Sequence, residues 1–266
     1  RDRGLGRSDP RRPISIGLRR SATQHCSRSN DLPAVSDKPA ARFGLDEIPI
    51  DADHDHDVTP ATLLMRRRGF LLEIRNDLES YISRDPTFLT SRVAYSPLHN
   101  APRIVIRMAE VSSYYNIGPM AAVAGAVADC VGQQLMKSQT DVIIENGGDI
   151  FVHTRKPIVF TLYAGENSPF SGKLKFKPAL SESSFGVCTS SGTVGHSYSQ
   201  GRADAVCVVS QTACQADAAA TAMGNKVKHK KDIGQVIHEA SNNQNIFGII
   251  VALEDKLGIW GEVEII

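Results

Sequence analysis

The sequence predicts an α+β fold in which helices and antiparallel strands are interleaved. Three observations support this prediction. Apolar residues recur with a helical period up to about residue 136, strand-like runs separated by glycine, proline and asparagine begin at Asp141, and two further helical stretches interrupt those runs. A regular strand–helix alternation, which would predict a doubly wound parallel sheet, is not seen.

Composition points to a globular protein with a locally built ligand site. The 266 residues are 41% hydrophobic, enough for one large domain or two small ones, and the net charge is only +1. Such a balance provides no field that would attract nucleic acid or an anionic membrane, so we expect neither as a partner and expect a small-molecule ligand instead. The five cysteines contain no Cys-x-x-Cys pair, which argues against a disulfide framework or a structural zinc site. No apolar run reaches the length of a membrane span or of a secretory signal, and we therefore expect a cytoplasmic protein.

Residues 1–43 differ from the rest of the chain. Eight arginines precede Asp31, and no apolar period could form a packed face, so this basic N-terminal segment is predicted to be disordered. It begins with Arg1 rather than methionine, and we expect it to be either a fragment end or translated sequence outside the natural protein. A transit peptide is the alternative for an Arg- and Ser-rich start, although no amphipathic helix is visible. The ordered domain is predicted to span residues 44–266.

The elements of this domain follow from local patterns. A short strand is expected at 45–50, and Thr59-Pro60 is typical of the start of a helix, which Asp85-Pro86 would end. Helices are also expected at 102–115, 119–136, 213–223 and 233–240. The helix at 119–136 is rich in small residues between Ala121 and Ala128, which would allow a backbone or a flat ligand to approach closely. Strands are expected at 142–145, 150–153, 158–163, 174–176, 186–189 and 205–209, and a hairpin at 246–266.

Asp217 and Thr221 form the most informative local pair. They are four residues apart and so share one face of a helix. A carboxylate and a hydroxyl in this arrangement could hold Mg²⁺, whose remaining positions are filled by water and ligand phosphates. The alternative is structural: Asp217 caps the helix and Thr221 bonds a carbonyl. Spacing alone leaves both interpretations open.

The segment Thr189–Ser197 follows a predicted strand and is rich in hydroxyls and glycines. Its candidate residues are Thr189, Ser190, Ser191, Gly192, Gly195 and Ser197 as ligand-binding groups and His196 as a general acid or base. Backbone N–H groups beside glycine, together with hydroxyls, can cradle a phosphate or an oxyanion. A polar surface loop is the alternative. Cys188, next to this loop, could be a nucleophile, although a buried strand cysteine is favoured.

Two further motifs are candidates for ligand or metal binding. Asn146, Gly147, Gly148 and Asp149 lie between two apolar strands, where they form either a simple hairpin turn or a turn that presents bare backbone and a carboxylate to a ligand. The run Asp53–Asp57 alternates Asp and His like a metal site, but it precedes a helix start and is more typical of a solvated turn.

The order of the motifs resembles an uncharacterised prokaryotic family of ApbE-like proteins. The resemblance rests on Gly118–Gly125, Glu145–Ile150, Cys188–Ser197, Ala203–Val206 and Ala216–Asn225, and it covers about residues 45–266. This family is related to the ApbE flavin transferases, which move FMN from FAD onto a protein threonine with Mg²⁺.

The resemblance implies a T-fold-like, ApbE-type domain with internal pseudo-duplication. It also implies that Asp217 and Thr221 are metal ligands, that Mg²⁺ and FAD or FMN are cofactors, and that Asn146–Asp149 and Thr189–Ser197 form pocket walls. Two departures separate the chain from the true transferases: the Asp-Pro-x-Thr-Gly segment after the histidine is missing, and Ala124 stands near the place of their lysine. His196 matches their histidine only in its order along the chain.

Three functions are therefore compatible with the sequence. The leading one is an ApbE-like enzyme of the transferase class that binds a flavin or other nucleotide-like ligand with Mg²⁺. The second is a non-catalytic ligand-binding protein that supports sulfur assimilation, and the third is direct FMN transfer from FAD. A homodimer is expected only by analogy with related folds.

Overall fold

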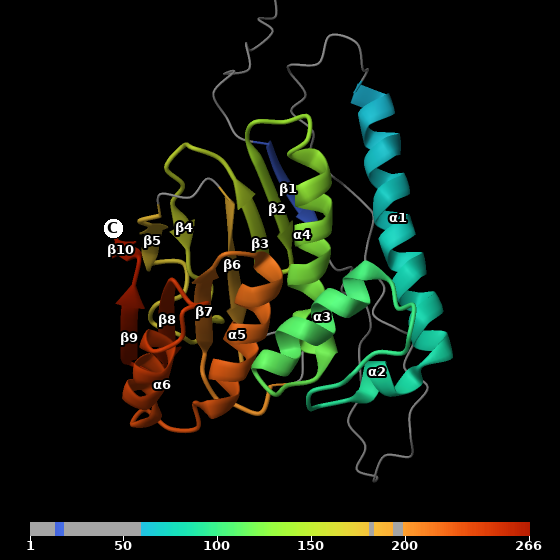
Figure 1. Ribbon diagram of the computed structural model, residues 1–266. Coiled ribbons are helices and arrows are strands. Elements are labelled where there is room, and N and C mark those ends of the chain that lie inside the picture. The colour runs from blue at the N-terminus through green and yellow to red at the C-terminus, as the bar shows by residue number, and fades with distance from the viewer. Residues whose placement is uncertain (1–13, 19–59, 181–183, 194–198) are drawn as a thin grey trace, which may run out of the picture.

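The main sheet organises the molecule. The computed structural model describes residues 14–18, 60–180, 184–193 and 199–266, and within these ranges it contains a seven-stranded sheet of order β1-β2-β3-β6-β7-β8-β9 (Figure 1). Strand β1 pairs with β2 in parallel, and every other neighbouring pair in this sheet is antiparallel. The strands are β1 (Ile14–Leu18), β2 (Val142–Asn146), β3 (Asp149–His153), β6 (Ser184–Ser190), β7 (Ala205–Ser210), β8 (Gly248–Leu253) and β9 (Lys256–Gly261).

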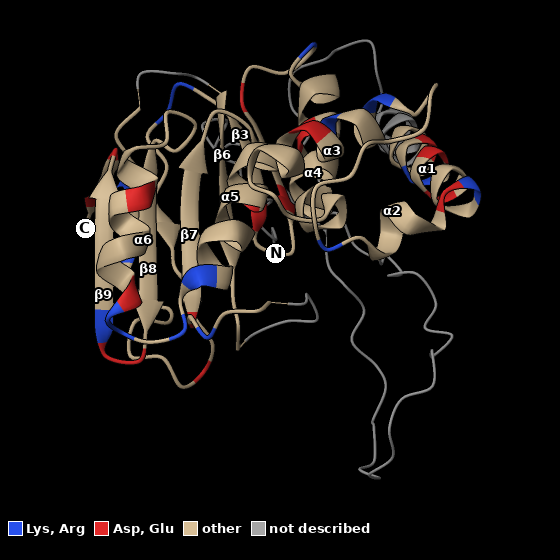
Figure 2. Ribbon diagram, turned by 60° about the horizontal axis from the view of Figure 1, so that its bottom comes forward, with Lys and Arg blue, Asp and Glu red and all other residues tan. Residues whose placement is uncertain are grey.

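Helices cover one face of this sheet (Figure 1). The helices in contact with the sheet are α4 (Val123–Leu135), α5 (Ala213–Lys226) and α6 (Asp232–Ser241). The other helical elements pack against these helices or against one another: α1 (Pro60–Arg84), α2 (Pro86–Thr90), α3 (Arg103–Tyr114) and the 3₁₀ turn η1 (Pro119–Ala122). The larger core lies between the helices and the sheet and includes Met108, Ile144 and Met223. Strands β7 and β8 carry no charged residue and are buried along their whole length, as expected for central strands covered on both faces (Figure 2).

A smaller antiparallel sheet accompanies the opposite face. It has the order β10-β5-β4 and consists of β4 (Phe160–Thr161), β5 (Lys175–Pro178) and β10 (Val263–Ile265). A second core joins the main sheet to this layer, with Val187 and Ile250 on one side and Leu162 and Phe176 on the other. The chain enters the small sheet directly after β9.

The predicted α+β class with antiparallel strands is confirmed. The small-residue helix is divided, because Pro119–Ala122 form a 3₁₀ turn before α4 begins at Val123. Of the strand expected at 158–163, only Phe160–Thr161 form a strand. The second strand of the hairpin expected at 246–266 ends at Gly261, whose φ of 88° turns the chain out of the main sheet.

The N-terminal segment differs from its prediction in one place. Ile14–Leu18, within residues expected to be disordered, pair with β2 as an edge strand. Five residues flanked by arginine-rich sequence give too little apolar pattern to be recognised as a strand without their partner. The strand expected at 45–50 and the Asp53–Asp57 motif lie outside the described residues. Within the described ranges, no helix combines the length and apolarity needed to cross a membrane.

Candidate functional site

The turn between β2 and β3 presents backbone to the surface. Gly147 and Gly148 adopt φ values of 66° and 104°, a left-handed region that other residues rarely enter. Nothing lies within 4 Å of the position that a side chain on Gly148 would take. The Thr189 amide donates to the Gly148 carbonyl at 3.2 Å, so this turn is tied to the end of β6.

Helix α5 places Asp217 against the beginning of α4. Thr212 is the N-cap of α5 and accepts a hydrogen bond from the Gln215 amide, so Asp217 does not cap its own helix. Instead, Asp217 Oδ2 accepts from the Gly125 amide of α4 at 2.9 Å. Gly125 lies in the first turn of α4, where amides have no partner within the helix. Asp217 is 9% exposed, and Thr221 lies one turn further along α5.

Asp129 makes the reciprocal contact from α4 to α5. Its two carboxylate oxygens accept from the Ala213 and Cys214 amides at 2.8 and 2.9 Å. Burial raises the pKa of Asp129 to about 6, although these two amide hydrogen bonds and the charge of Arg107 act in the opposite direction. Each helix therefore supplies a carboxylate to the N-terminus of the other.

A pocket of about 570 Å³ opens where these elements meet. It brings together most of the predicted site residues, namely Gly147, Gly148, Asp149, Thr189, Ser190, Ser191, Asp217 and Thr221. Three glycine-rich or hydroxyl-rich segments that are separate in the sequence thus share one pocket. This volume lies within the range typical of small-molecule sites.

The other predicted residues are placed differently. Asn146 is 1% exposed and does not line the pocket; its Nδ2 donates to the Ala124 carbonyl, and its Oδ1 is buried without a partner among the described residues. Gly192 lines a neighbouring hollow. Gly195, His196 and Ser197 lie outside the described residues, so the proposed role of His196 stays a prediction.

Part of the pocket wall was not predicted from the sequence. Leu89 and Ile117 contribute apolar surface, and Arg92 and Tyr163 contribute a guanidinium and an aromatic ring. These residues come from α2, from connections and from the loop after β4, and no local spacing links them to Asp217. Only the motif Gly118–Gly125, which supports the family resemblance, indicated that η1 and the start of α4 would matter.

The pocket is electronegative among its described lining residues. They include three carboxylates, Glu145, Asp149 and Asp217, and one guanidinium, Arg92, which gives a sum of −2. A phosphate-bearing ligand would therefore need a cation beside these carboxylates. The carboxylate of Asp217 and the hydroxyl of Thr221 are oxygen donors of the kind that Mg²⁺ prefers. No cluster of three or more His, Cys, Asp and Glu able to hold a metal occurs in the described part of the chain.

Cys188 lies beneath this site as a buried strand residue. Its Sγ donates to the Ala213 carbonyl at 3.2 Å. Burial, followed by the nearby charges of Asp149 and Asp217, raises the pKa of Cys188 well above its usual value. A thiol held neutral in this way is a packing group, in agreement with the interpretation favoured from the sequence.

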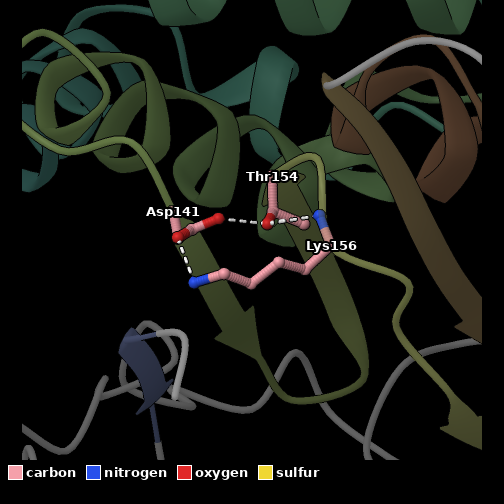
Figure 3. A network of polar contacts seen from close by, with 3 residues as sticks. All are labelled: Asp141, Thr154 and Lys156. Atoms are coloured by element: carbon pink, nitrogen blue, oxygen red, sulfur yellow. Dashed lines mark hydrogen bonds and ion pairs between the residues drawn. The ribbon is translucent and has the colours of Figure 1, made fainter. Parts of the chain in front are cut away.

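A second carboxylate–hydroxyl pair lies at the far end of the same hairpin. Asp141 accepts hydrogen bonds from Thr154 Oγ1 and, at 2.6 Å, from Lys156 Nζ, and the Lys156 amide donates to Thr154 Oγ1 (Figure 3). None of these three residues lines the pocket. They provide a matched comparison for Asp217 and Thr221.

Comparison with known proteins gives one consistent family. The family model described as AbpE bacteria matches residues 34–245. A UPF0280 protein of Methanococcus vannielii is 42% identical over 73% of this chain and 80% of its own length, and one of Methanocaldococcus jannaschii is 41% identical over 73% and 80%. Among solved structures, the chain is similar to the ApbE protein of Thermotoga maritima, with 14% identity, a TM-score of 0.41, and coverage of 77% of this chain and 76% of that one.

Proposed function

This chain belongs to the AbpE bacteria family, and we propose that it binds a flavin or another nucleotide-like ligand together with Mg²⁺ in the pocket around Asp217. The observation that carries the proposal is the convergence of Asp217 and Thr221 with the turn at Gly147–Asp149 and the hydroxyls of Thr189–Ser191. Family membership agrees with the resemblance drawn from the five sequence motifs.

The chemistry of the pocket wall supports a ligand with two different ends. Leu89, Ile117 and Met120 offer apolar surface that suits a planar ring, and Tyr163, 59% exposed, offers an aromatic face. Thr189, Ser190 and Ser191 offer hydroxyl donors suited to phosphate oxygens. A ring linked to a phosphate group would satisfy both kinds of surface.

Asp217 and Thr221 would hold the Mg²⁺. Bound there, the ion would neutralise phosphate charge and polarise a phosphoryl oxygen. Asp217 keeps its position because the Gly125 amide donates to it, and its burial limits competition from water. The hydroxyls of Thr189–Ser191 would orient the phosphate, a positioning role that is compatible with group transfer.

Ligand-dependent thermal unfolding tests this proposal. The full chain is heated with FAD or FMN, each with and without Mg²⁺. A ligand at about 100 times its dissociation constant stabilises by roughly 2.7 kcal/mol, which corresponds to a rise in Tm of roughly 5–10 °C for a chain of this size. We expect this rise with FAD and Mg²⁺ together.

Matched variants distinguish the pocket from general effects. Asp217→Asn and Thr221→Val should abolish the Mg²⁺-dependent part of the rise, whereas Asp141→Asn and Thr154→Val, which change the same residue types outside the pocket, should retain it. Each variant is compared with its own ligand-free Tm, because Asp217 also holds the Gly125 amide. An unchanged response in Asp217→Asn would refute the metal assignment.

Product analysis separates the remaining functions. A non-catalytic binding protein supporting sulfur assimilation would return FAD chemically intact, whereas an FMN transferase would leave a covalent flavin on an acceptor peptide. The missing Asp-Pro-x-Thr-Gly segment favours a reaction other than FMN transfer, or binding alone.

We propose a T-fold-like internal pseudo-duplication, supported by two similar units in which helices precede an antiparallel hairpin: α4 with β2–β3, and α5–α6 with β8–β9. A homodimer is proposed by analogy with such folds alone.

A further inference from the structure

A second hollow of about 680 Å³ lies beside the pocket and has the opposite charge. Five basic side chains line it, and we call it the basic hollow: Arg202, Lys228, His229, Lys230 and Lys231. Two carboxylates, Asp204 and Glu254, also line it, so four full positive charges face two negative ones, a sum of +2 with histidine neutral.

The two acidic residues are already engaged. Glu254 pairs with Lys230 at 2.6 Å, and Asp255, just outside the hollow, pairs with the same ammonium group at 2.6 Å. These two partners, Asp255 first, raise the pKa of Lys230 to about 12. Asp204 Oδ2 accepts from the Glu254 amide at 2.7 Å. Lys230 is therefore neutralised locally, and within the described residues neither Asp204 nor Glu254 forms an ion pair with another cation of the hollow.

The other cations form no ion pair within the described residues, and a further carboxylate, Asp232, lies just outside the hollow, where its charge interacts with His229 and Lys231. In the described part of the chain, no hydrogen bond or ion pair engages the side chains of Arg202 or Lys231, and Lys228 Nζ donates only to the uncharged carbonyl of Gln200. Lysines and arginines are visible at the turns below α5 and α6 in Figure 2. An excess of cations around one hollow is the arrangement expected for an anionic ligand.

The walls of the basic hollow are held by the backbone. The Arg202 amide donates to the Val227 carbonyl at 2.8 Å, and the Asp204 amide donates to the Ala252 carbonyl at 2.9 Å. A Cβ on Gly201 would lie 1.8 Å from the Gly224 carbonyl oxygen, so the chain passes directly over the end of α5. These contacts place Arg202 beside the Lys228–Lys231 turn before any ligand arrives.

We propose that the basic hollow binds a small polyanion that carries phosphate groups, through Arg202, Lys228 and Lys231. The guanidinium matches two phosphate oxygens at once, and the ammonium groups supply charge. Two of the turn's amides are already engaged, because Asp232 Oδ2 accepts from the Lys228 and His229 amides. We therefore assign recognition to the side chains.

The basic hollow and the pocket share a wall. Ser191 and Gln200 line the pocket, and the next residues along the chain, Gly192 and Gly201, line the basic hollow. The two sites are nevertheless chemically distinct, because the pocket needs a cation to accept phosphate and the basic hollow does not. The proposal can therefore hold whether or not the pocket binds a flavin.

Calorimetric titration with inorganic pyrophosphate tests the proposal. The full chain is titrated at low salt with a chelator present, so that divalent ions cannot support phosphate binding in the pocket. The double variant Arg202→Gln/Lys231→Gln should bind at least tenfold more weakly than the unaltered chain. Raising the salt concentration should weaken binding to the unaltered chain more than to the variant, because fewer charges remain to be screened.

A charge-matched control completes the experiment. Lys173→Gln/Lys175→Gln removes two exposed lysines near the small sheet and gives the same net charge, and it should bind pyrophosphate like the unaltered chain. Asp217→Asn should also leave this binding intact. No binding by the unaltered chain, or equal loss in both double variants, would overturn the proposal; circular dichroism of the ligand-free proteins verifies that all are folded.

Discussion

At the scale of single residues, Asp129 shows how burial and hydrogen bonding compete on one carboxylate. Its two amide partners at the start of α5 favour the charged form, and its burial between α4 and α5 favours the neutral form. Burial is the larger effect, so its pKa in the folded chain, about 6, lies above the usual value. Asp129 therefore binds a proton more strongly in the folded state than in the unfolded one.

This difference predicts a pH dependence of stability. The contribution of protonated Asp129 is fully present below the unfolded pKa of about 3.9 and is lost as pH rises through about 6. The difference between the folded and unfolded pKa of Asp129 corresponds to about 3 kcal/mol. Urea unfolding at pH 4 to 7 should show the free energy of unfolding of Asp129→Asn falling less over this interval than that of the unaltered chain. Parallel curves for the two proteins would show that burial does not control this carboxylate.

Local residue geometry also determines which site residues could be identified from the sequence. Asp217 and Thr221 were visible because one helix fixes their spacing, and Gly147 and Gly148 because their turn requires left-handed backbone. The contact of Asp217 with Gly125 spans 92 residues and has no local signature. The sequence was compatible with Asp217 as a metal ligand or as the cap of its own helix. The structure shows that Asp217 caps a different helix, α4.

At the scale of elements, α4 and α5 form the unit that carries the candidate site. Each supplies a carboxylate to the first turn of the other, and their small residues allow the two backbones to approach closely. A Cβ on Gly125 would lie 2.3 Å from the Ala213 carbonyl oxygen and 2.8 Å from Asp217 Cβ. Contacts this short leave no room for even a methyl group.

Substitution of helical glycines tests this packing. Gly125→Ala should destabilise the protein by roughly 1–3 kcal/mol, because overpacking at α5 exceeds the gain in helix propensity. Gly234→Ala in α6, where nothing lies within 4 Å of the added Cβ, should instead stabilise it by up to about 1 kcal/mol. Chemical denaturation measures both changes. Equal effects of the two substitutions would mean that the α4–α5 contact is looser than the structure indicates.

At the scale of the whole molecule, the order of strands leaves β1 at one edge of the main sheet. β1 lies more than a hundred residues before its partner β2, and the β1–β2 pair is the only parallel pair in the described residues. Long-range pairing of this kind cannot be predicted from local patterns, because it depends on the unpaired backbone N–H and C=O groups at the edge of a distant strand.

Removal of the N-terminal segment tests the role of β1. A chain beginning at Gly44 should still fold, since both cores lie in residues that it retains. Hydrogen exchange of the β2 amides at 142–146 should become faster than in the full chain, because the edge of β2 is exposed, while exchange in central β8 should not change. Unaltered protection of β2 would show that β1 does not hold this edge in solution.

The sequence by itself determined the α+β class, the main helices and strands, the family, and three of the segments that line the pocket. These features are recorded locally, in apolar periods, helix ends, turn glycines and the order of motifs. Only the tertiary structure decided that Asp217 and Asp129 cap each other's helices, that Asn146 is buried beside the pocket, and that the Lys228–Lys231 turn meets Arg202 around a separate hollow. The physical reason is that caps, burial and charge balance depend on partners brought together by folding from distant parts of the chain, and no local spacing specifies those partners.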